Sequence, residues 1–203
     1  MLKVAPYRIA ALLDLKVKEL EEVVYFVSHI VLEAGDSKHF SEKEVLDLGS
    51  SKINKTREKL RETILEVINI INDPEHRDTR KANRLLEELN NTSIPFSIDE
   101  ATTLIGKYTG AKFGIGARAV EYLLKKIDLE KESQAIKAEL SNLKKSPNDR
   151  SKLMKRLETL DSLRRSNQRP EWMVMRVIPV IPPDIRPIIQ LDGGRFTTSE
   201  IND

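Results

Sequence analysis

Cysteine is absent from this sequence of 203 residues. That absence excludes a disulfide-stabilised scaffold, a zinc site with cysteine ligands and a thiol nucleophile, and it fits a reducing compartment such as the cytoplasm. The longest strongly apolar segment, residues 23–32, has ten residues and includes Ser28 and His29, whereas a membrane-spanning helix needs about twenty. Residues 1–8 lack the apolar core of a signal peptide. We therefore expect a cytoplasmic protein without a membrane segment.

Aromatic residues are scarce at 5%, and neither charge sign dominates, since 34 Lys and Arg residues are balanced by 32 Asp and Glu residues. A net charge of +2 is too small for the whole chain to act as a polyanion-binding protein, so any basic surface must be local. Charged residues still make up 33% of the chain, against about a quarter in typical domains. Because only 39% of the residues are hydrophobic, the apolar side chains must gather on particular faces, which favours long charged helices.

Proline divides the chain, because five of its nine prolines lie between residues 170 and 187. Everything before that segment can be helical. Two short helices are expected first, at 8–13 and 18–24. Residues 23–32 are rich in β-branched and aromatic side chains, which favour a strand. We therefore expect a change from helix to strand near Tyr25.

The middle of the chain has the pattern of a charged helical insertion. Ser41 and Glu44 have the spacing of a capping box, which predicts that a helical segment opens there. A second capping box at Ser97 and Glu100 predicts a helix that Gly110 ends. The helices expected in this part are 52–72, 79–89 and 97–110, followed by a glycine-punctuated loop at 110–116.

Residues 117–145 are predicted to form a helix that bends at Ile127 and Asp128, and Ser146-Pro147 has the pattern of a new helix start. Leucine and isoleucine recur at the spacing of a helical hairpin seam: Leu129, Ile136, Leu140 and Leu143 on one arm, and Leu153, Leu157, Leu160 and Leu163 on the other. After Pro170, residues 172–178 form a candidate strand that could pair with 25–32. The predicted class is α+β, mostly α: a helical hairpin, a helical insertion, a small antiparallel strand pair and an extended proline-rich C-terminal segment.

Sequence signatures of catalysis and cofactor binding are missing. Gly114 and Gly116 follow a predicted helix rather than a strand, so they do not form a dinucleotide-binding fingerprint, and no phosphate-binding loop occurs. The three histidines lack the spacing of metal ligands. Acidic residues are mostly accompanied by Lys or Arg at helical spacing, which is typical of solvated pairs. We nominate no catalytic residue and no metal ligand.

One local charge excess stands out, because residues 137–169 contain ten basic and four acidic residues. A basic helical hairpin can contact phosphates and release their counterions, which makes binding salt-dependent. An ordinary solvated face is the alternative, and the sequence leaves it open. The candidate phosphate contacts are Lys144, Lys145, Arg150, Lys152, Lys155, Arg156, Arg164 and Arg165.

The C-terminal segment carries three uncommon motifs in order: P-E-W-M at 170–173, P-V-I-P-P-D-I-R-P at 179–187 and L-D-G-G-R-F-T-T-S at 191–199. With them, the chain resembles the bacterial RNA polymerase beta-prime subunit. Residues 6–26 and the segments 116–120 and 127–129 are also similar to this family, whereas residues 35–105 match it poorly. The resemblance implies a clamp core formed by 1–34 and 106–185, which includes the hairpin 129–166. Residues 35–105 would be a helical insertion and 186–203 the lid loop.

The resemblance further implies a part of DNA-directed RNA polymerase, a nucleotidyltransferase, that holds nucleic acid and separates RNA from the template during transcription. We expect an excised piece of a longer subunit that is inactive alone, with no cofactor, since the magnesium and zinc sites of the family lie outside it. The implied partners are the beta and alpha subunits, sigma factor, template DNA and nascent RNA. The implied lid residues are Asp192, Gly193, Gly194, Arg195, Phe196, Thr197 and Thr198.

Two alternatives accompany these expectations. For the lid, the alternative is a glycine turn with ordinary flanking residues. For the chain as a whole, it is a helical protein-interaction module that docks its basic hairpin on an acidic partner.

Overall fold

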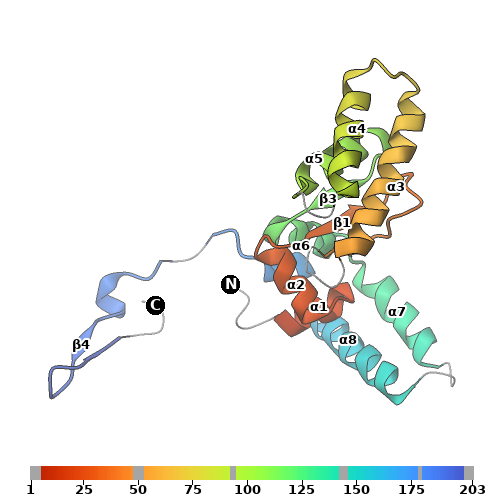
Figure 1. The fold of residues 1–203 in the computed structure, drawn as a ribbon. Helices are drawn as coiled ribbons and strands as arrows, with labels where there is room; N and C mark the ends of the chain where they lie inside the picture. Colours follow the sequence, from red (N-terminus) through yellow and green to blue (C-terminus); the bar gives the residue numbers. More distant parts are fainter. Residues whose placement is uncertain (1–5, 48–52, 92–94, 142–145, 178–179, 199–203) are drawn as a thin grey trace.

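The computed structural model describes residues 6–47, 53–91, 95–141, 146–177 and 180–198, and helices dominate its regular structure (Figure 1). The α-helices are α1 (Pro6–Leu13), α2 (Val17–Val24), α3 (Ile53–Ile71), α4 (Arg77–Asn90), α5 (Ile98–Thr109), α6 (Gly116–Lys125), α7 (Leu129–Leu140) and α8 (Pro147–Arg165). The strands are β1 (His29–Glu33), β2 (Val45–Leu46), β3 (Lys112–Gly114), β4 (Ile189–Gln190) and β5 (Phe196–Thr197), and two 3₁₀ turns cover Pro170–Met173 and Pro183–Ile185. The predicted α+β, mostly helical class is confirmed. Within the described ranges, no helix is long and apolar enough to cross a bilayer.

A three-stranded antiparallel sheet of order β2–β1–β3 lies at the centre of the helices. Its middle strand places consecutive side chains on opposite faces, as the strand repeat of two requires. Ile30 belongs to one hydrophobic core and Val31 to a second, and both are fully buried. The sheet therefore separates two cores, and its central strand is apolar on both faces.

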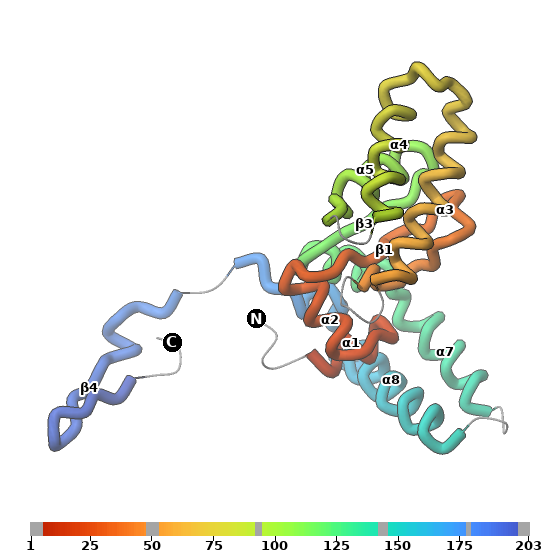
Figure 2. Tube along the Cα trace, viewed as in Figure 1, coloured from red at the N-terminus to blue at the C-terminus, as the bar shows by residue number. Residues whose placement is uncertain are grey.

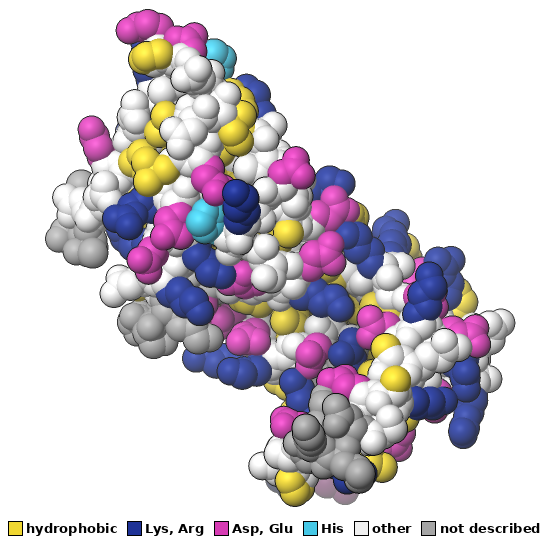
Figure 3. Space-filling model, turned by 90° about the vertical axis from the view of Figure 1, so that its right-hand side faces the viewer, with side chains coloured by type: hydrophobic (Ala, Val, Ile, Leu, Met, Phe, Trp, Pro, Cys, Tyr) yellow, Lys and Arg dark blue, Asp and Glu magenta, His cyan; other side chains and the backbone are white. Residues whose placement is uncertain are grey.

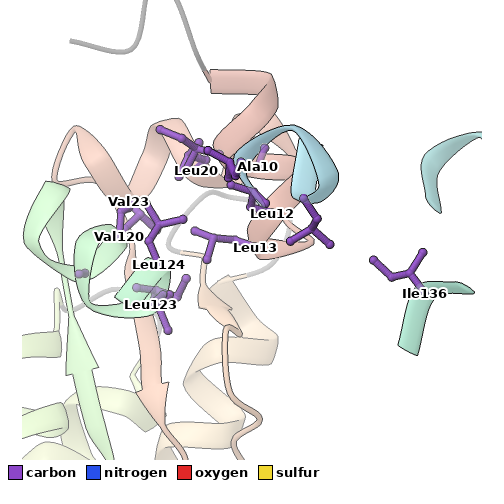
Figure 4. Packing of buried hydrophobic residues seen from close by; sticks show 14 residues of the cluster. Ala10, Leu12, Leu13, Leu20, Val23, Val120, Leu123, Leu124 and Ile136 are labelled. Carbon is purple, nitrogen blue, oxygen red and sulfur yellow. The ribbon is translucent and has the colours of Figure 1, made fainter. Parts of the chain in front are cut away.

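The first core joins the N-terminal helices to the helical hairpin. Side chains from α1, α2 and α6 converge in Figure 4, and Ile136 of α7 adds to them. Leu160 and Leu163 of α8 belong to the same cluster, and Leu129, Leu140, Leu153 and Leu157 pack against it. The predicted hairpin seam is confirmed for these residues, whereas Leu143 lies outside the described residues.

The second core is formed by α3, α4 and α5, which stand together at one end of the molecule in Figure 1. Leu60, Ile64 and Val67 of α3 are fully buried at the spacing of one helical face. Phe40 meets Phe113 of β3 edge to face at a centroid distance of 5.3 Å. This aromatic pair ties the loop after β1 to the sheet.

Several helix ends follow the local signals in the sequence. The side chain of Ser97 accepts a hydrogen bond from the backbone N–H of Glu100 at the start of α5, and Gly110 ends that helix in the left-handed conformation. Ser146 caps α8, with Pro147 at its first turn. Helices predicted at 52–72 and 79–89 are observed as α3 and α4. The switch near Tyr25 is confirmed as well, because α2 ends at Val24 and β1 begins at His29.

Four local predictions need correction. The capping box at Ser41 and Glu44 starts no helix: Glu44 does bond the backbone N–H of Ser41, at 3.1 Å, but the chain turns into β2. The loop 110–116 contains strand β3, since it pairs with β1. The helix 117–145 is interrupted after Lys125, because Asp128 caps a separate α7 with bonds to two backbone N–H groups.

The fourth correction concerns residues 172–178, which do not form a strand in their described part. Pro170–Met173 is a 3₁₀ turn instead, and β1 pairs with β2 and β3. Met173 and Val174 pack against the first core, as expected of this segment, whereas Trp172, Met175 and Val177 are exposed. Met173 and Val174 therefore reach the first core without joining a sheet.

The C-terminal segment leaves the helices as an arm, which Figures 1 and 2 show extending away from α1 and α8. It contains the 3₁₀ turn Pro183–Ile185 and a small antiparallel hairpin of β4 and β5. The segment was predicted to be extended and proline-rich, and the described part is extended apart from that 3₁₀ turn and the turn at the tip of the hairpin.

Candidate nucleic-acid interface

The hairpin at the end of the arm has a tight, well-defined tip. Gln190 pairs with Phe196, and the backbone N–H of Leu191 donates to the carbonyl of Arg195 at 2.7 Å. Gly193 and Gly194 have φ angles of +91° and +77°, in the region that glycine enters without strain. No atom lies within 4 Å of where their Cβ atoms would be. Backbone conformation alone therefore explains the need for glycine here.

The residues implied as lid residues are brought together on this hairpin, and all of residues 191–198 are exposed. Phe196 shows 68% of its surface to solvent although it is a large aromatic residue. Ile188, Ile189 and Leu191 beside it are also exposed. A hairpin with one guanidinium, one aromatic ring and several exposed aliphatic side chains has the composition of a surface that another molecule covers.

The basic residues of the hairpin α7–α8 fall into two groups. Some are engaged within the protein. Arg156 is mostly buried, donates to Glu132 at 2.8 Å and to the carbonyl of Leu12 at 3.3 Å, and so braces α8 against α7 and α1. Lys152 pairs with Asp14 at 2.7 Å. Arg164 lies 3.5 Å from Asp161.

The second group consists of Arg150, Lys155 and Arg165, which are exposed along α8. They line a groove together with Met154 and Leu157. Within the described part of the chain, no ion pair neutralises these three side chains. Lys144 and Lys145 lie outside the described residues. Within the described part of the helical hairpin α7–α8, Arg150, Lys155 and Arg165 are thus exposed cations of α8 that can meet an outside anion.

On the face shown in Figure 3, Lys and Arg are interspersed with Asp and Glu over most of the surface. Such mixing is expected when oppositely charged side chains pair within one helix or across neighbouring strands. The pairs include Arg84 with Glu88 at 3.5 Å and Lys112 with Glu33 at 2.8 Å. A local excess of one sign therefore has to be sought on individual helices.

The histidines have structural partners. His29 bonds Asp99 at 2.8 Å and joins β1 to α5, and His76 caps α4 by accepting from the N–H of Asp78. His39 contacts Glu62 and Glu66 of α3, both at 3.1 Å. Among the described residues, no cluster of three or more His, Asp or Glu side chains could hold a metal ion.

One arrangement at the root of the arm was not predicted from the sequence. Arg176 contacts Glu121 of α6 with two nitrogens, and Lys125 lies 3.2 Å from the same carboxylate. The Arg176 guanidinium, helped by Lys125, lowers the pKa of Glu121. The two partners are 55 residues apart, so no spacing rule could have joined them.

Comparison with known proteins gives the family of the chain. The family model described as RNA polymerase Rpb1, domain 1, matches residues 5–203. The chain belongs to this family. The matched range spans residues 35–105, the segment expected to match the family poorly.

Relatives of this Rpb1 domain 1 chain are named DNA-directed RNA polymerase subunit beta'. The relative from Mycoplasma mycoides subsp. mycoides SC is 82% identical over 203 residues, which is all of this chain and 16% of the relative. The relative from Mesoplasma florum is 72% identical over 204 residues, and that from Mycoplasma pneumoniae is 43% identical over 207, again with 16% of each relative covered. The chain thus spans about one sixth of the length of these relatives.

Proposed function

We propose that the chain is a part of the clamp of a DNA-directed RNA polymerase beta-prime subunit and that residues 186–203 act as its lid, which separates the transcript from the template. The observation that carries this proposal is the exposed hairpin at 189–197, which combines a glycine turn with Arg195 and Phe196. Membership of the Rpb1 domain 1 family supports it. A solvent-exposed glycine turn without a partner would not require several exposed apolar side chains beside it.

The residue types suit strand separation. Phe196 can act as an apolar wedge against a base pair, since aromatic rings stack on bases with a gain of about 1–3 kcal/mol per base. Arg195 offers a delocalised, forked cation for phosphate contact or base stacking. Asp192, Thr197 and Thr198 can bond to nucleotide groups around the tip. The glycine pair lets the backbone pass close to the nucleic acid.

The exposed cations of α8 give the body of the protein a second role, which is to hold the duplex. Arg150, Lys155 and Arg165 can each neutralise one phosphate, with the counterion release that makes such binding salt-dependent. Arg156, Lys152 and Arg164 support the shape of this surface through their internal pairs. In this proposal the helices hold the DNA duplex, and the arm separates the transcript from the template, as expected of a clamp that ends in a lid.

Catalysis belongs, in this proposal, to the assembled enzyme. The chain would work together with the beta and alpha subunits and sigma factor on template DNA and nascent RNA, in the cytoplasm, and would be inactive alone. It would bind no cofactor of its own. The family match does not favour the alternative of a separate protein-interaction module.

The test uses the polymerase assembled with a variant subunit. Phe196→Ala and Arg195→Ala should lengthen the RNA–DNA hybrid and slow transcript displacement, while the rate of nucleotide addition stays close to that of the unaltered enzyme. Val180→Ala is the matched control, because Val180 is an exposed apolar residue of the same arm but lies outside the hairpin. An unaltered hybrid length in both variants would reject the lid assignment.

A further inference from the structure

The segment that connects α8 to the arm is attached to the body at successive points. Glu171 is buried and accepts from Arg169 at 2.8 Å. Met173 and Val174 pack against the first core. Arg176 then reaches α6, one residue before the described part of this segment ends at Val177. The last of these contacts joins the segment to α6 through an ion pair, and it lies where the arm leaves the body.

The contact between Arg176 and Glu121 is bidentate. Arg176 Nε donates to the two carboxylate oxygens of Glu121 at 3.0 and 3.3 Å, and Nη2 donates to Oε1 at 2.6 Å. The Glu121 side chain is only 11% exposed, whereas that of Arg176 is 68% exposed. The carboxylate is therefore a fixed acceptor on the body, and the guanidinium comes to it from the arm.

The position of Glu121 on α6 makes it rigid. Its neighbours Val120 and Leu123 are buried in the first core, so the helix cannot shift without disturbing that core. A planar fork bound at two oxygens fixes direction as well as distance, unlike the single contact of an ammonium group. The pair thus restrains the orientation of the backbone at Arg176.

Two fixed points define a direction, whereas one does not. Packing of Val174 supplies the first point and the Arg176–Glu121 pair supplies the second, with Met175 between them. We propose that Glu121 and Arg176 are positioning residues that set the direction in which the arm leaves the body and so aim the hairpin at its target. The part of this inference that concerns the target depends on the proposed lid function, but the geometric part does not.

An ion pair with one largely exposed partner, as Arg176 is here, contributes little to the free energy of unfolding. Loss of this pair is accordingly expected to leave the body folded. Loss of the pair should instead change the position of the hairpin tip relative to the helices. A measurement of arm geometry therefore separates a positioning role from a merely stabilising one.

The absence of cysteine allows clean placement of two spin labels, at Glu130→Cys on α7 and at Asp192→Cys at the tip of the hairpin. Pulsed electron resonance on the 203-residue chain then gives the distribution of label distances. Arg176→Gln and Glu121→Gln should each broaden that distribution, on the order of twofold, because the arm then pivots at Val174. Arg176→Lys, which keeps the charge but not the fork, should give an intermediate width.

Lys125→Gln is the matched control, because it removes the other cation of Glu121 and leaves the arm contact intact. It should preserve the width. Circular dichroism of each variant checks that the helices are unchanged. A width that stays the same in both Arg176→Gln and Glu121→Gln would overturn the inference, as would equal broadening in Lys125→Gln.

The same variants distinguish this inference from the lid proposal. In the assembled polymerase, Phe196→Ala tests the lid with the Arg176–Glu121 pair intact. If that variant leaves transcript displacement unchanged while Glu121→Gln still broadens the distance distribution of the chain, the lid proposal fails and the positioning role stands. If Phe196→Ala impairs displacement but no distribution broadens, the lid proposal stands and the positioning role is overturned.

Discussion

Ile30 and Val31 are neighbours in β1, and their side chains lie in two different hydrophobic cores. The strand has helices on both faces: α1, α2 and α6 contribute to one core and α3, α4 and α5 to the other. A strand buried on both faces needs a continuous apolar run rather than alternation. The short apolar run Ile30-Val31-Leu32 satisfies this requirement and makes β1 the link between the two halves of the described structure.

Substitution of these two residues should therefore destabilise different helices. Ile30→Ala removes a fully buried side chain from the first core and should lower the free energy of unfolding by about 2–5 kcal/mol. Val31→Ala should cost about 2 kcal/mol. Residue-resolved hydrogen exchange should show faster exchange in α1 and α6 for the first variant and in α3 and α5 for the second. Identical exchange profiles would mean that the two cores unfold as one unit.

Gly35 and Gly110 provide a second, paired prediction. Both have positive φ angles, +59° and +70°, but a Cβ on Gly35 would lie 2.3 Å from the carbonyl oxygen of Thr109, whereas no atom lies within 4 Å of one on Gly110. Gly110→Ala should cost about 1 kcal/mol from the left-handed backbone alone. Gly35→Ala should cost about 3 kcal/mol or more, because backbone must move. Urea unfolding of both variants measures the difference, and equal costs would contradict the close approach.

Local signals in the sequence were sufficient for most helices. Ser97, Gly110 and Ser146-Pro147 mark helix ends that the structure shows at the same places. These signals work because a cap depends on backbone groups within three or four residues. The hairpin seam was also predictable, since its leucines repeat at helical spacing along one face.

Strand pairing and the positions of functional side chains depend on long-range contacts, and there the sequence was insufficient. Ser41 and Glu44 make one bond of a capping box, yet pairing with β1 draws the next residues into β2. The predicted strand after Pro170 does not form in its described part, and Met173 and Val174 instead pack against the helices of the first core. The sequence does not distinguish the basic residues of α8 from one another. The structure does, because Arg156 pairs with Glu132 of α7 whereas Arg150 is exposed to solvent.

Acid should weaken the protein through two carboxylates with strongly lowered pKa values. Bonds from Lys107 and Tyr108 hold the pKa of Asp78 at about 2, against an ordinary 3.8. Lys112, Tyr122 and Lys126 hold that of Glu33 at about 2, against 4.5. A lowered carboxyl pKa means that the stabilising pair is complete above the ordinary value and is lost as pH falls toward the folded value.

The urea midpoint of unfolding should consequently be steady above pH 5 and fall between about pH 4.5 and 2. Asp78→Asn and Glu33→Gln should each lower the midpoint at pH 7 and flatten the decline in acid, because the titrating group is gone. Midpoints recorded from pH 7 to pH 2 test this. A full wild-type decline in the double variant would show that other groups cause the acid sensitivity.

Arg57 is a buried cation that closes the C-terminal end of α4. One of its nitrogens, Nη1, donates to the carbonyls of Glu88, Leu89 and Asn91 at 3.1–3.2 Å, and its guanidinium lies 4.7 Å from the centre of the Phe96 ring. Arg57→Met keeps the length of the side chain but leaves these carbonyls without their donor. The expected cost is about 1–3 kcal/mol, measured by urea unfolding, and a neutral effect would mean that water replaces the guanidinium.

The exposed cations of α8 should contribute to the salt dependence of DNA binding. Each phosphate contact contributes about 0.9 to the slope of log affinity against log salt concentration. Arg150→Gln, Lys155→Gln and Arg165→Gln should therefore each reduce that slope by about one in the 203-residue chain, and weaken binding equally for unrelated DNA sequences. Lys152→Gln is the internal control, because Lys152 already pairs with Asp14 and should change the slope less. Slopes that are the same in all four variants would assign these side chains to an ordinary solvated face, because a cation that releases no counterion makes no phosphate contact.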